Sequence, residues 1–356
     1  MRAPVRLSLN IRVVAIFGIL LLISIIYFIN TYRLSADDWK CIQDEWNGNT
    51  TALGTADFHT HFRISFADQE HNFSWIHLPR LNGKSPKILM MVMSRPDGLA
   101  RRNVLRDTWM NPNMSRIVND GTMKGIFVCG KGDDMNVMED LKVEAEKFGD
   151  ILIADFDDHY LNLPFKTLTA LIFAVSRMES VELIGKIDED VIFYPDQLIP
   201  LFTNDIINTR TSAIYGHKYD YGKKVIHQMT RKWHIPEASF KCRMYPPYIS
   251  GPCYFITRRA AVTVLNTTKF RKLISVEDAL ITGILATDTD ITLKHLDFIY
   301  HIPEATSDNS NKQLIAWHSL KSDTEFKRYI EKMRRIRCIA CRYKREDSDE
   351  NEKVII

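Results

Sequence analysis

The 356-residue sequence lacks the short motifs that mark several large enzyme classes. It has no G-x-G-x-x-G of a dinucleotide-binding domain, no P-loop, no H-E-x-x-H of a zinc protease and no G-x-S-x-G of a serine hydrolase. A strong excess of charge is also missing: the formal net charge is +3, and the basic residues are scattered without interleaved aromatic residues. The absent motifs narrow the enzyme classes to consider, and the charge pattern gives no reason to expect a nucleic-acid partner.

Charged residues are absent from residues 13–29, which read VVAIFGILLLISIIYFI. A run of this length is near the lower limit for a membrane-spanning helix. Arginines precede it and the first acidic residue, Asp37, follows it, so the positive-inside rule places the N-terminus in the cytosol. We therefore expect a cytosolic tail (1–12), a transmembrane signal-anchor (13–29) and a luminal remainder. The alternative is a cleaved signal peptide, but the run is longer than a typical signal-peptide core and no small-x-small cleavage site follows it.

The sequence after the apolar run has two features that suit the lumen. Four N-x-S/T sequons, candidate glycosylation sites, occur at Asn49, Asn72, Asn113 and Asn266. All six cysteines also follow the run, and an oxidising compartment lets them pair, although the sequence does not define the pairs. Cys338 and Cys341 form a C-x-x-C without two further ligands at zinc-site spacing, so we expect a structural disulfide there.

Strand-like and helix-like segments alternate from residue 87 onwards. Short apolar runs predict buried strands at 87–93, 125–129, 151–154 and 181–187. Helical spacing or composition predicts helices at 98–109, 133–148 and 164–178. This alternation predicts a single α/β domain at 87–340 with a mostly parallel central sheet flanked by helices. The polar segment 30–86 lacks sustained periodicity and is read as a stem, and 341–356 as a charged tail.

Four Asp-x-Asp pairs occur, at 155/157, 188/190, 288/290 and 347/349. The first two follow predicted strands, and α/β sheets bind ligands at that edge. A hard divalent cation prefers such carboxylate oxygens, and it would neutralise a departing diphosphate. For any single pair the alternative is a surface turn with solvated acids. The pair 288/290 is read as a turn before a strand, and 347/349 lies in the charged tail.

Two further pairs of charged residues carry no function by themselves. Arg102 and Arg106 are four residues apart on a predicted helix and share a face, which suits a phosphate, a carboxylate or simply solvent. Glu277 and Asp278 begin an apolar helix, and acids are common there because of the helix dipole.

Seven segments, in one order, together resemble the β-1,3-galactosyltransferase family, which includes β-1,3-N-acetylglucosaminyltransferases. They are RRNVLRDTW (101–109), FVCG (127–130), GDILIADFDDHYLNLPFKTL (149–168), KIDEDVIFYPDQL (186–198), KW (232–233), YPPYISGPCYFIT (245–257) and EDALITG (277–283). The resemblance covers about residues 87–320. No single segment decides it, but seven in the right order and spacing are specific.

The resemblance implies a GT-A-type fold, a UDP-sugar donor, Mn²⁺ and inversion at the anomeric carbon. Asp190 matches the family's metal-binding acid, and Asp188 matches the acid near the nucleotide and the metal. His318, in IAWHSL, looks like the late histidine that completes the metal site. Asp278 matches the aspartate of the family's Glu-Asp-Val motif, which is the general base.

The donor pocket and the cysteines are also compared through this resemblance. Residues in segments that line the family's donor pocket are Arg102, Arg106, Asp155 and Lys166. Glu189 replaces a middle aspartate, which lengthens one side chain of the acidic motif. Ile249 stands where many members have cysteine and Cys253 replaces one of a small pair, which suggests a disulfide re-wired through Cys253.

The resemblance thus implies an inverting β-1,3-hexosyltransferase that moves galactose, N-acetylglucosamine or N-acetylgalactosamine from a UDP-sugar to a glycan on a protein or lipid. Such an enzyme would be a single-pass type II protein of the Golgi membrane with a luminal catalytic domain. One alternative is a non-catalytic luminal protein of the same fold, such as a lectin or a chaperone-like partner. Another is a glycoside hydrolase with two carboxylates, which would use no nucleotide.

Overall fold

The computed structural model describes residues 17–24, 34–45, 60–80, 83, 85–296, 299–300, 314–318 and 322–335. Of the predicted anchor, only 17–24 is described, and it is helical. Among the described helices, none combines the length and the apolar character that crossing a bilayer requires. The two predicted tails, 1–12 and 341–356, lie outside the described residues, as do Asn49 and the C-x-x-C at Cys338.

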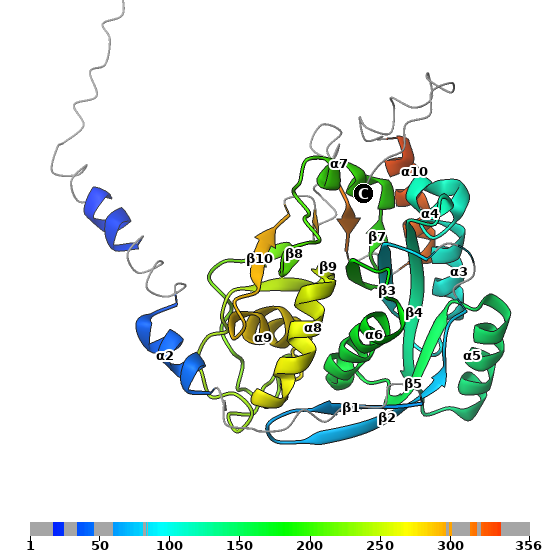
Figure 1. The fold of residues 1–356 in the computed structure, drawn as a ribbon. Coiled ribbons are helices and arrows are strands. Elements are labelled where there is room, and N and C mark those ends of the chain that lie inside the picture. Colours follow the sequence, from blue (N-terminus) through cyan, green and yellow to red (C-terminus); the bar gives the residue numbers. More distant parts are fainter. Residues whose placement is uncertain are drawn as a thin grey trace, which may run out of the picture.

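The described residues form a nine-stranded sheet in the order β1-β2-β5-β4-β3-β6-β9-β8-β10 and a small sheet in the order β11-β12-β7 (Figure 1). The strands of the large sheet are β1 (His61–Ser65), β2 (Glu70–His77), β3 (Ile88–Met93), β4 (Met123–Lys131), β5 (Ile151–Asp157), β6 (Leu183–Asp188), β8 (Ala213–Tyr219), β9 (Tyr248–Thr257) and β10 (Thr292–His295). Those of the small sheet are β7 (Ile192–Phe193), β11 (Ile299–Tyr300) and β12 (Ala316–Trp317).

Helices connect these strands. They are α2 (Ala36–Asp44), α3 (Leu99–Asp107), α4 (Arg116–Asn119), α5 (Met135–Phe148), α6 (Leu163–Arg177), α7 (Leu198–Thr203), α8 (Arg258–Thr267), α9 (Leu285–Thr287) and α10 (Asp323–Arg335). Shorter turns of helix are η1 (Pro112–Met114), η2 (Tyr160–Asn162), η3 (Pro195–Gln197), η4 (Thr268–Phe270) and the π-helix η5 (Ala279–Ile284).

The large sheet is mixed, which corrects the expectation of a mostly parallel one. Strands β5, β4, β3 and β6 run parallel to one another, as the alternating segments predicted, and β10 runs parallel to β8. Strands β2 and β9 pair antiparallel with the two edges of this parallel block. The added strands come from before residue 87 and after residue 187, outside the alternating stretch on which the expectation rested.

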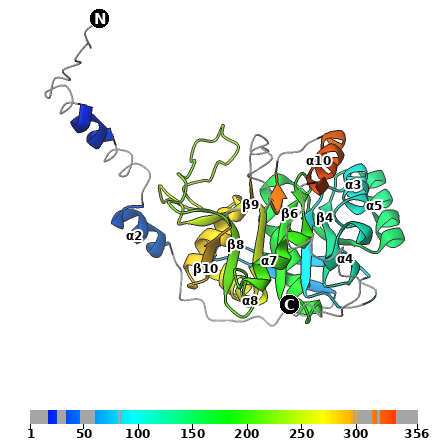
Figure 2. The ribbon, with the colours of Figure 1, turned by 90° about the horizontal axis from the view of Figure 1, so that it is seen from above.

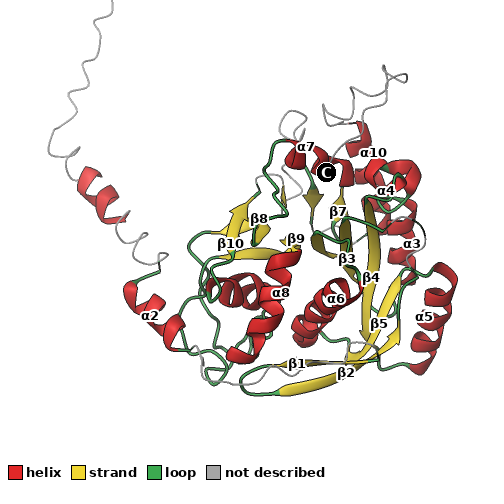
Figure 3. Cartoon of the chain, in the orientation of Figure 1, coloured by secondary structure: helices red, strands yellow, loops and turns green. Residues whose placement is uncertain are grey.

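Two apolar cores lie on the two faces of the sheet. Leu89, Met91 and Met93 of β3 face α6 and α8, whereas Ile88 and Met90 face the side covered by α3, α5 and α10 (Figure 3). Alternate residues of a strand point to opposite faces, so a continuous apolar run is needed where both faces are covered. This explains why the parallel strands were visible in the sequence.

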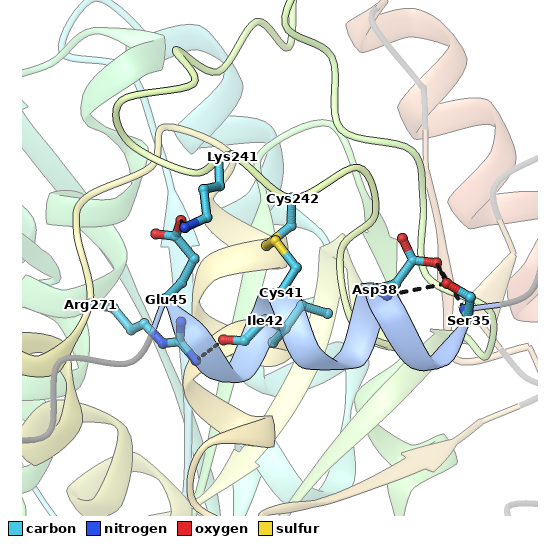
Figure 4. The surroundings of a disulfide bond; sticks show 8 residues. All are labelled: Ser35, Asp38, Cys41, Ile42, Glu45, Lys241, Cys242 and Arg271. Atoms are coloured by element: carbon cyan, nitrogen blue, oxygen red, sulfur yellow. Dashed lines mark hydrogen bonds and ion pairs between the residues drawn. A yellow bond between two sulfur atoms is a disulfide. The ribbon is translucent and has the colours of Figure 1, made fainter.

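The N-terminal segment read as a stem is partly built into the domain, so the boundary at residue 86 is corrected. Strand β2 extends the large sheet by pairing with β5, and β1 pairs with β2. Helix α2 is joined to the loop before β9 by the Cys41–Cys242 disulfide (Figure 4). Beside that bond Arg243 lies 2.6 Å from the Asp38 carboxylate, and Arg271 donates to the Ile42 carbonyl at 2.7 Å.

Candidate functional site

Three predicted metal ligands come together at the carboxyl end of β6. Asp188 is the last residue of β6, and the chain turns there, with the Val191 amide donating to the Asp188 carbonyl. His318 directly follows β12, which pairs with β7 just after the turn. Ligand atoms of Asp188, Asp190 and His318 all lie within 4.8 Å of one another, and His318 Nε2 is 3.5 Å from Asp190 Oδ1.

The chemistry of this cluster fits a divalent cation. Two carboxylates and an imidazole are ligands that Mn²⁺ and similar ions accept. All three side chains are partly exposed, which leaves room for a substrate to complete the coordination. Burial raises the pKa of Asp190 and the charge of Asp188 raises it further, although His318 acts in the opposite direction. A cation at this point would offset the cost of holding two carboxylates together.

A buried lysine supports the cluster from behind. Lys186 Nζ donates to Asp188 Oδ1 at 2.5 Å and to the Gly251 carbonyl at 2.7 Å, and it lies 3.8 Å from Glu277 Oε2. Burial alone would lower the pKa of Lys186, but the charges of Asp188 and Glu277 raise it above its ordinary value. Lys186 therefore stays charged and fixes the direction of the Asp188 carboxylate.

Glu277 is the buried partner of this lysine. Tyr254 donates its hydroxyl to Glu277 Oε1 at 2.8 Å, while Oε2 has no hydrogen-bond partner. Burial raises the pKa of Glu277 to about 7, against the opposing effect of Lys186. The side chain is 3% exposed, so it cannot reach a substrate and acts on its neighbours.

Asp278 lies beside the cluster through Gly251. Gly251 donates its amide to Asp278 Oδ2 at 2.9 Å, while its carbonyl accepts from Lys186. The second oxygen, Oδ1, accepts from the Ala279 amide at 2.9 Å, at the start of η5. Burial raises the pKa of Asp278, which makes its carboxylate a stronger proton acceptor, and the side chain remains partly exposed.

The predicted donor residues Arg102 and Arg106 bind other parts of the protein. Arg102 is 1% exposed; it forks onto the Glu144 carboxylate and donates to the carbonyls of the loop after β3. Arg106 bonds Glu144 and Asp150, and Asp150 precedes β5 at the end of the strand away from the cluster. The structure thus brings neither guanidinium to Asp188 and Asp190, and gives both arginines a structural role.

Lys166 and Asp155 are likewise engaged within the fold. Lys166 Nζ donates to Asp158 at 2.8 Å and to the Ser94 carbonyl at 2.6 Å, which holds the start of α6 against the end of β3. Asp155 accepts from the Ser74 amide at 2.6 Å, on β2. Strand β5 is three places from β6 in the sheet, so Asp155 is not brought to the cluster.

Glu189, between the two aspartates, also turns away from them. Its carboxylate accepts from the Ser94 hydroxyl at 2.9 Å and from Arg95 Nε at 2.9 Å. The longer side chain thus ties the acidic turn to the loop after β3. The pair 288/290 has no part in the site, because Asp288 is paired with Arg271 at 2.6 Å.

The family follows from a comparison of the whole chain. Residues 100–297 match the family model described as Galactosyltransferase. The chain belongs to the galactosyltransferase family. It is 46% identical to the β-1,3-galactosyltransferase bre-2 of Caenorhabditis elegans over 335 residues, which cover 93% of each chain. Members of this family are glycosyltransferases, and the chain is accordingly a hexosyltransferase.

More distant relatives align over about half of each chain. A lactosylceramide 1,3-N-acetyl-β-D-glucosaminyltransferase of Xenopus laevis is 27% identical over 51% of this chain and 49% of its own. The mouse β-1,3-galactosyltransferase 1 is 25% identical over 54% of this chain and 58% of its own. Among solved structures, the galactosyltransferase LgtC, bound to donor and acceptor sugar analogues, is similar with a TM-score of 0.35 and 10% identity over 69% of this chain and 95% of its own.

The structure bears on two expectations, one about glycosylation and one about cysteine pairing. Asn72, Asn113 and Asn266 are exposed, and their glycosylation stays a prediction. The disulfide expected through Cys253 is wrong: Cys253 is a free, buried thiol on β9, as is Cys129 on β4. The described disulfide joins Cys41 to Cys242 instead.

Sequence reasoning missed the residues that support the site. Lys186 gave a signal, because it is a charged residue inside the apolar run VELIGKI, which was read as a buried strand. Glu277 gave none, since an acid in a first helical turn is ordinary. Glu144 and Asp158 bind basic residues whose positions were predicted, but pairing between distant segments leaves no local pattern.

A surface hollow lies elsewhere. It is lined by Pro86, Phe173 and Met178 among others, around the end of α6 and the amino ends of β3 and β6. The cluster follows the carboxyl end of β6, so the two lie at opposite ends of these strands.

Proposed function

We propose that this galactosyltransferase-family chain is an inverting, metal-dependent β-1,3-hexosyltransferase of GT-A type. The donor is a UDP-sugar, with galactose first because the 46% identical relative is named for it, and N-acetylglucosamine and N-acetylgalactosamine as alternatives. The acceptor is a hydroxyl of a glycan on a protein or lipid. The observation that carries the proposal is the Asp188, Asp190 and His318 cluster beside the partly exposed Asp278.

Asp278 is assigned as the general base. The acceptor hydroxyl attacks the anomeric carbon from the side opposite the UDP, and its proton passes to the Asp278 carboxylate. The bond from the anomeric carbon to the diphosphate breaks as the new glycosidic bond forms, so the configuration inverts and UDP leaves. The raised pKa of Asp278, which comes from its burial, supports this role.

Asp188, Asp190 and His318 are assigned to Mn²⁺ or a similar ion. A bound divalent cation would neutralise the charge that gathers on the departing diphosphate. Lys186 holds Asp188 in position for this, and the partly exposed Asp190 leaves one side of the site open to the donor.

The test uses the full-length protein in detergent with Mn²⁺ and each of the three UDP-sugars, and measures UDP release against a panel of glycans. Asp278→Asn should abolish transfer while UDP and metal binding stay near normal. Asp190→Ala should lose Mn²⁺-dependent UDP binding. Glu179→Gln, an exposed acid before the amino end of β6 and thus at the opposite end of that strand from the cluster, is the matched control. Normal turnover in Asp278→Asn would refute the base, and UDP binding without transfer in the wild type would favour a non-catalytic protein.

The proposed location is the Golgi membrane, as a single-pass type II protein anchored by residues 13–29. Two observations support a luminal domain: the Cys41–Cys242 disulfide, which needs an oxidising compartment, and exposed sequons such as Asn113. Two measurements check this location. An endoglycosidase should remove N-glycans from the protein, and sealed microsomes should protect the domain from added protease. A domain that is digested without detergent would contradict it.

A further inference from the structure

Two aromatic side chains from distant segments form an exposed pair. Tyr160 belongs to η2, which follows β5, and Trp233 belongs to the long segment between β8 and β9, seen in Figure 2 as a wide yellow-green loop. Tyr160 is 44% exposed and Trp233 is 51% exposed. Large aromatic residues exposed together are common at binding surfaces, because their burial against a partner is favourable.

This aromatic pair, Tyr160 and Trp233, is held in place. Trp233 Nε1 donates to the Tyr160 hydroxyl at 2.9 Å, which links the two segments. Ile235, two residues after Trp233, is fully buried, and its carbonyl bonds His227 Nδ1 at 2.8 Å. The Cys242 disulfide fixes the same segment to α2. The rings are therefore ordered before a ligand arrives, which lowers the entropy cost of binding.

The segment that carries Trp233 ends against the element that carries the base. Its last residues lead into Tyr248, and a Cβ built on Gly283 of η5 would lie 2.9 Å from the Tyr248 Cβ. The Ile249 amide donates to the Thr282 hydroxyl of η5 at 2.9 Å. On the other side, η2 with Tyr160 follows the carboxyl end of β5, which belongs to the same parallel block as β6, so Tyr160 lies at the sheet edge that also carries Asp188.

We propose that Tyr160 and Trp233 bind the acceptor sugar, by stacking on the apolar face of a pyranose ring next to Asp278. The negative face of an aromatic ring attracts the polarised C–H groups of a sugar face. The base must touch the acceptor hydroxyl, and the segment that carries Trp233 leads into β9, where the Gly251 amide holds the Asp278 carboxylate; this favours the acceptor over the donor as the occupant. This inference rests on the proposed function and names the acceptor side of that site.

The experiment measures acceptor KM and UDP affinity separately in the full-length protein. Trp233→Ala should raise the KM for methyl β-glycoside acceptors about tenfold, and leave the UDP dissociation constant within about twofold. Trp233→Phe should restore most of the acceptor affinity, because it keeps a ring. Tyr160→Phe keeps its ring and loses only the hydrogen bond, so its KM should change less. Met229→Ala, exposed on the same segment, is the matched control.

Two results would overturn the assignment. One is an unchanged acceptor KM in Trp233→Ala, and the other is a loss of UDP affinity instead, which would place the uracil ring on the aromatic pair. If Trp233→Ala does not fold, Trp233→Leu replaces it: this variant keeps an apolar side chain without the ring, so it should raise the acceptor KM at unchanged UDP affinity, and an unchanged KM would overturn the assignment.

Failure of the proposed function is recognised separately. If the wild type transfers no sugar, saturation-transfer NMR with the same methyl glycosides measures binding alone. The aromatic pair would be supported even without transfer if Trp233→Phe keeps the binding of the glycosides and truncation of Tyr160 or Trp233 weakens it. No binding by the wild type would reject it.

Discussion

Lys186 is the residue on which the geometry of the site depends most. It is 2% exposed and its ammonium group contacts Asp188, Glu277 and the Gly251 carbonyl. Removing one partner of a buried ion pair leaves an uncompensated charge, which costs far more than losing an exposed pair. The acids proposed to bind the metal and to accept the proton are thus positioned by a buried cation.

Replacing Lys186 by methionine should therefore lower the free energy of unfolding by about 3–5 kcal/mol. The same replacement of Lys87, whose pair with Glu182 is about half exposed, should cost less than about 1 kcal/mol. Urea denaturation of the two variants beside the wild type measures both. Equal costs would show that the buried network contributes no more than a surface pair.

Glu277 should make stability fall as the pH rises. Its pKa is raised to about 7 in the folded protein, above its ordinary value. Between the two values the folded state keeps a proton that the unfolded state releases, so the free energy of unfolding decreases by up to about 3 kcal/mol across that window. The stability is fully present below the ordinary pKa and is lost as the pH passes about 7.

Glu277→Gln removes this titration. The gap in unfolding free energy between wild type and variant should change by about 3 kcal/mol between pH 4 and pH 8. Glu237→Gln, an exposed acid, should follow the wild type at every pH. Parallel curves for wild type and Glu277→Gln would mean that Glu277 has an ordinary pKa.

The acids of the site could be named from the sequence, while their supports could not. Asp188, Asp190 and Asp278 fall in segments whose order resembles a family, and the structure places them beside one another through Gly251. Arg106 and Asp155 fall in such segments too, yet their side chains turn to Asp150 and Ser74. A segment can be matched by its pattern, but the direction of each side chain depends on neighbours from other segments.

At the scale of the elements, apolar runs in the sequence predicted strands correctly only where both faces of the sheet are covered. Strands β3 and β6 appeared at their positions within two residues, because each is buried on both sides. Strand β2 was missed, since its residues are partly exposed and it depends on pairing with the distant β5. The expected helix after Glu277 is present, but as the π-helix η5, a form often found at functional sites.

Gly251, on β9, is a further element-scale constraint. A Cβ there would lie 3.1 Å from Asp278 Oδ2, so Gly251→Ala should push the base by a few tenths of an ångström. We expect kcat to fall roughly tenfold or more, because small displacements of a reacting group are costly, with UDP affinity unchanged. Gly132→Ala, whose nearest neighbour is at an ordinary 3.4 Å, should keep its kcat. Steady-state kinetics at saturating donor and acceptor decide between them.

At the scale of the whole molecule, one covalent link joins the N-terminal segment to the loop before β9. The Cys41–Cys242 disulfide spans 201 residues, and loop-closure entropy gives such a bond roughly 5 kcal/mol as an upper estimate. Cys242→Ser should lower the free energy of unfolding by up to that amount. The double variant Cys41→Ser/Cys242→Ser should lose no more unfolding free energy than the less stable of the two single variants, because each single change already breaks the same bond.

Urea unfolding with and without reductant measures this, and reduction should bring the wild type to the level of the variants. A wild type insensitive to reductant, or costs that add in the double variant, would show that the two cysteines contribute through packing instead. The link also explains the misplaced boundary of the stem: a helix without apolar periodicity, such as α2, is held by Cys41 and Asp38, and such tertiary bonds are invisible in its own sequence.

The same bond closes more than half of the 356-residue chain into a ring. Exposed basic residues such as Arg231 and Lys232 lie within that ring, where trypsin can cut. A single cut there opens the ring without separating any part, so the nicked protein keeps its full mass on a non-reducing gel. Reduction alone would then divide it into two fragments. A preparation that gives a single band on a non-reducing gel can therefore contain protein whose backbone is cleaved next to Trp233.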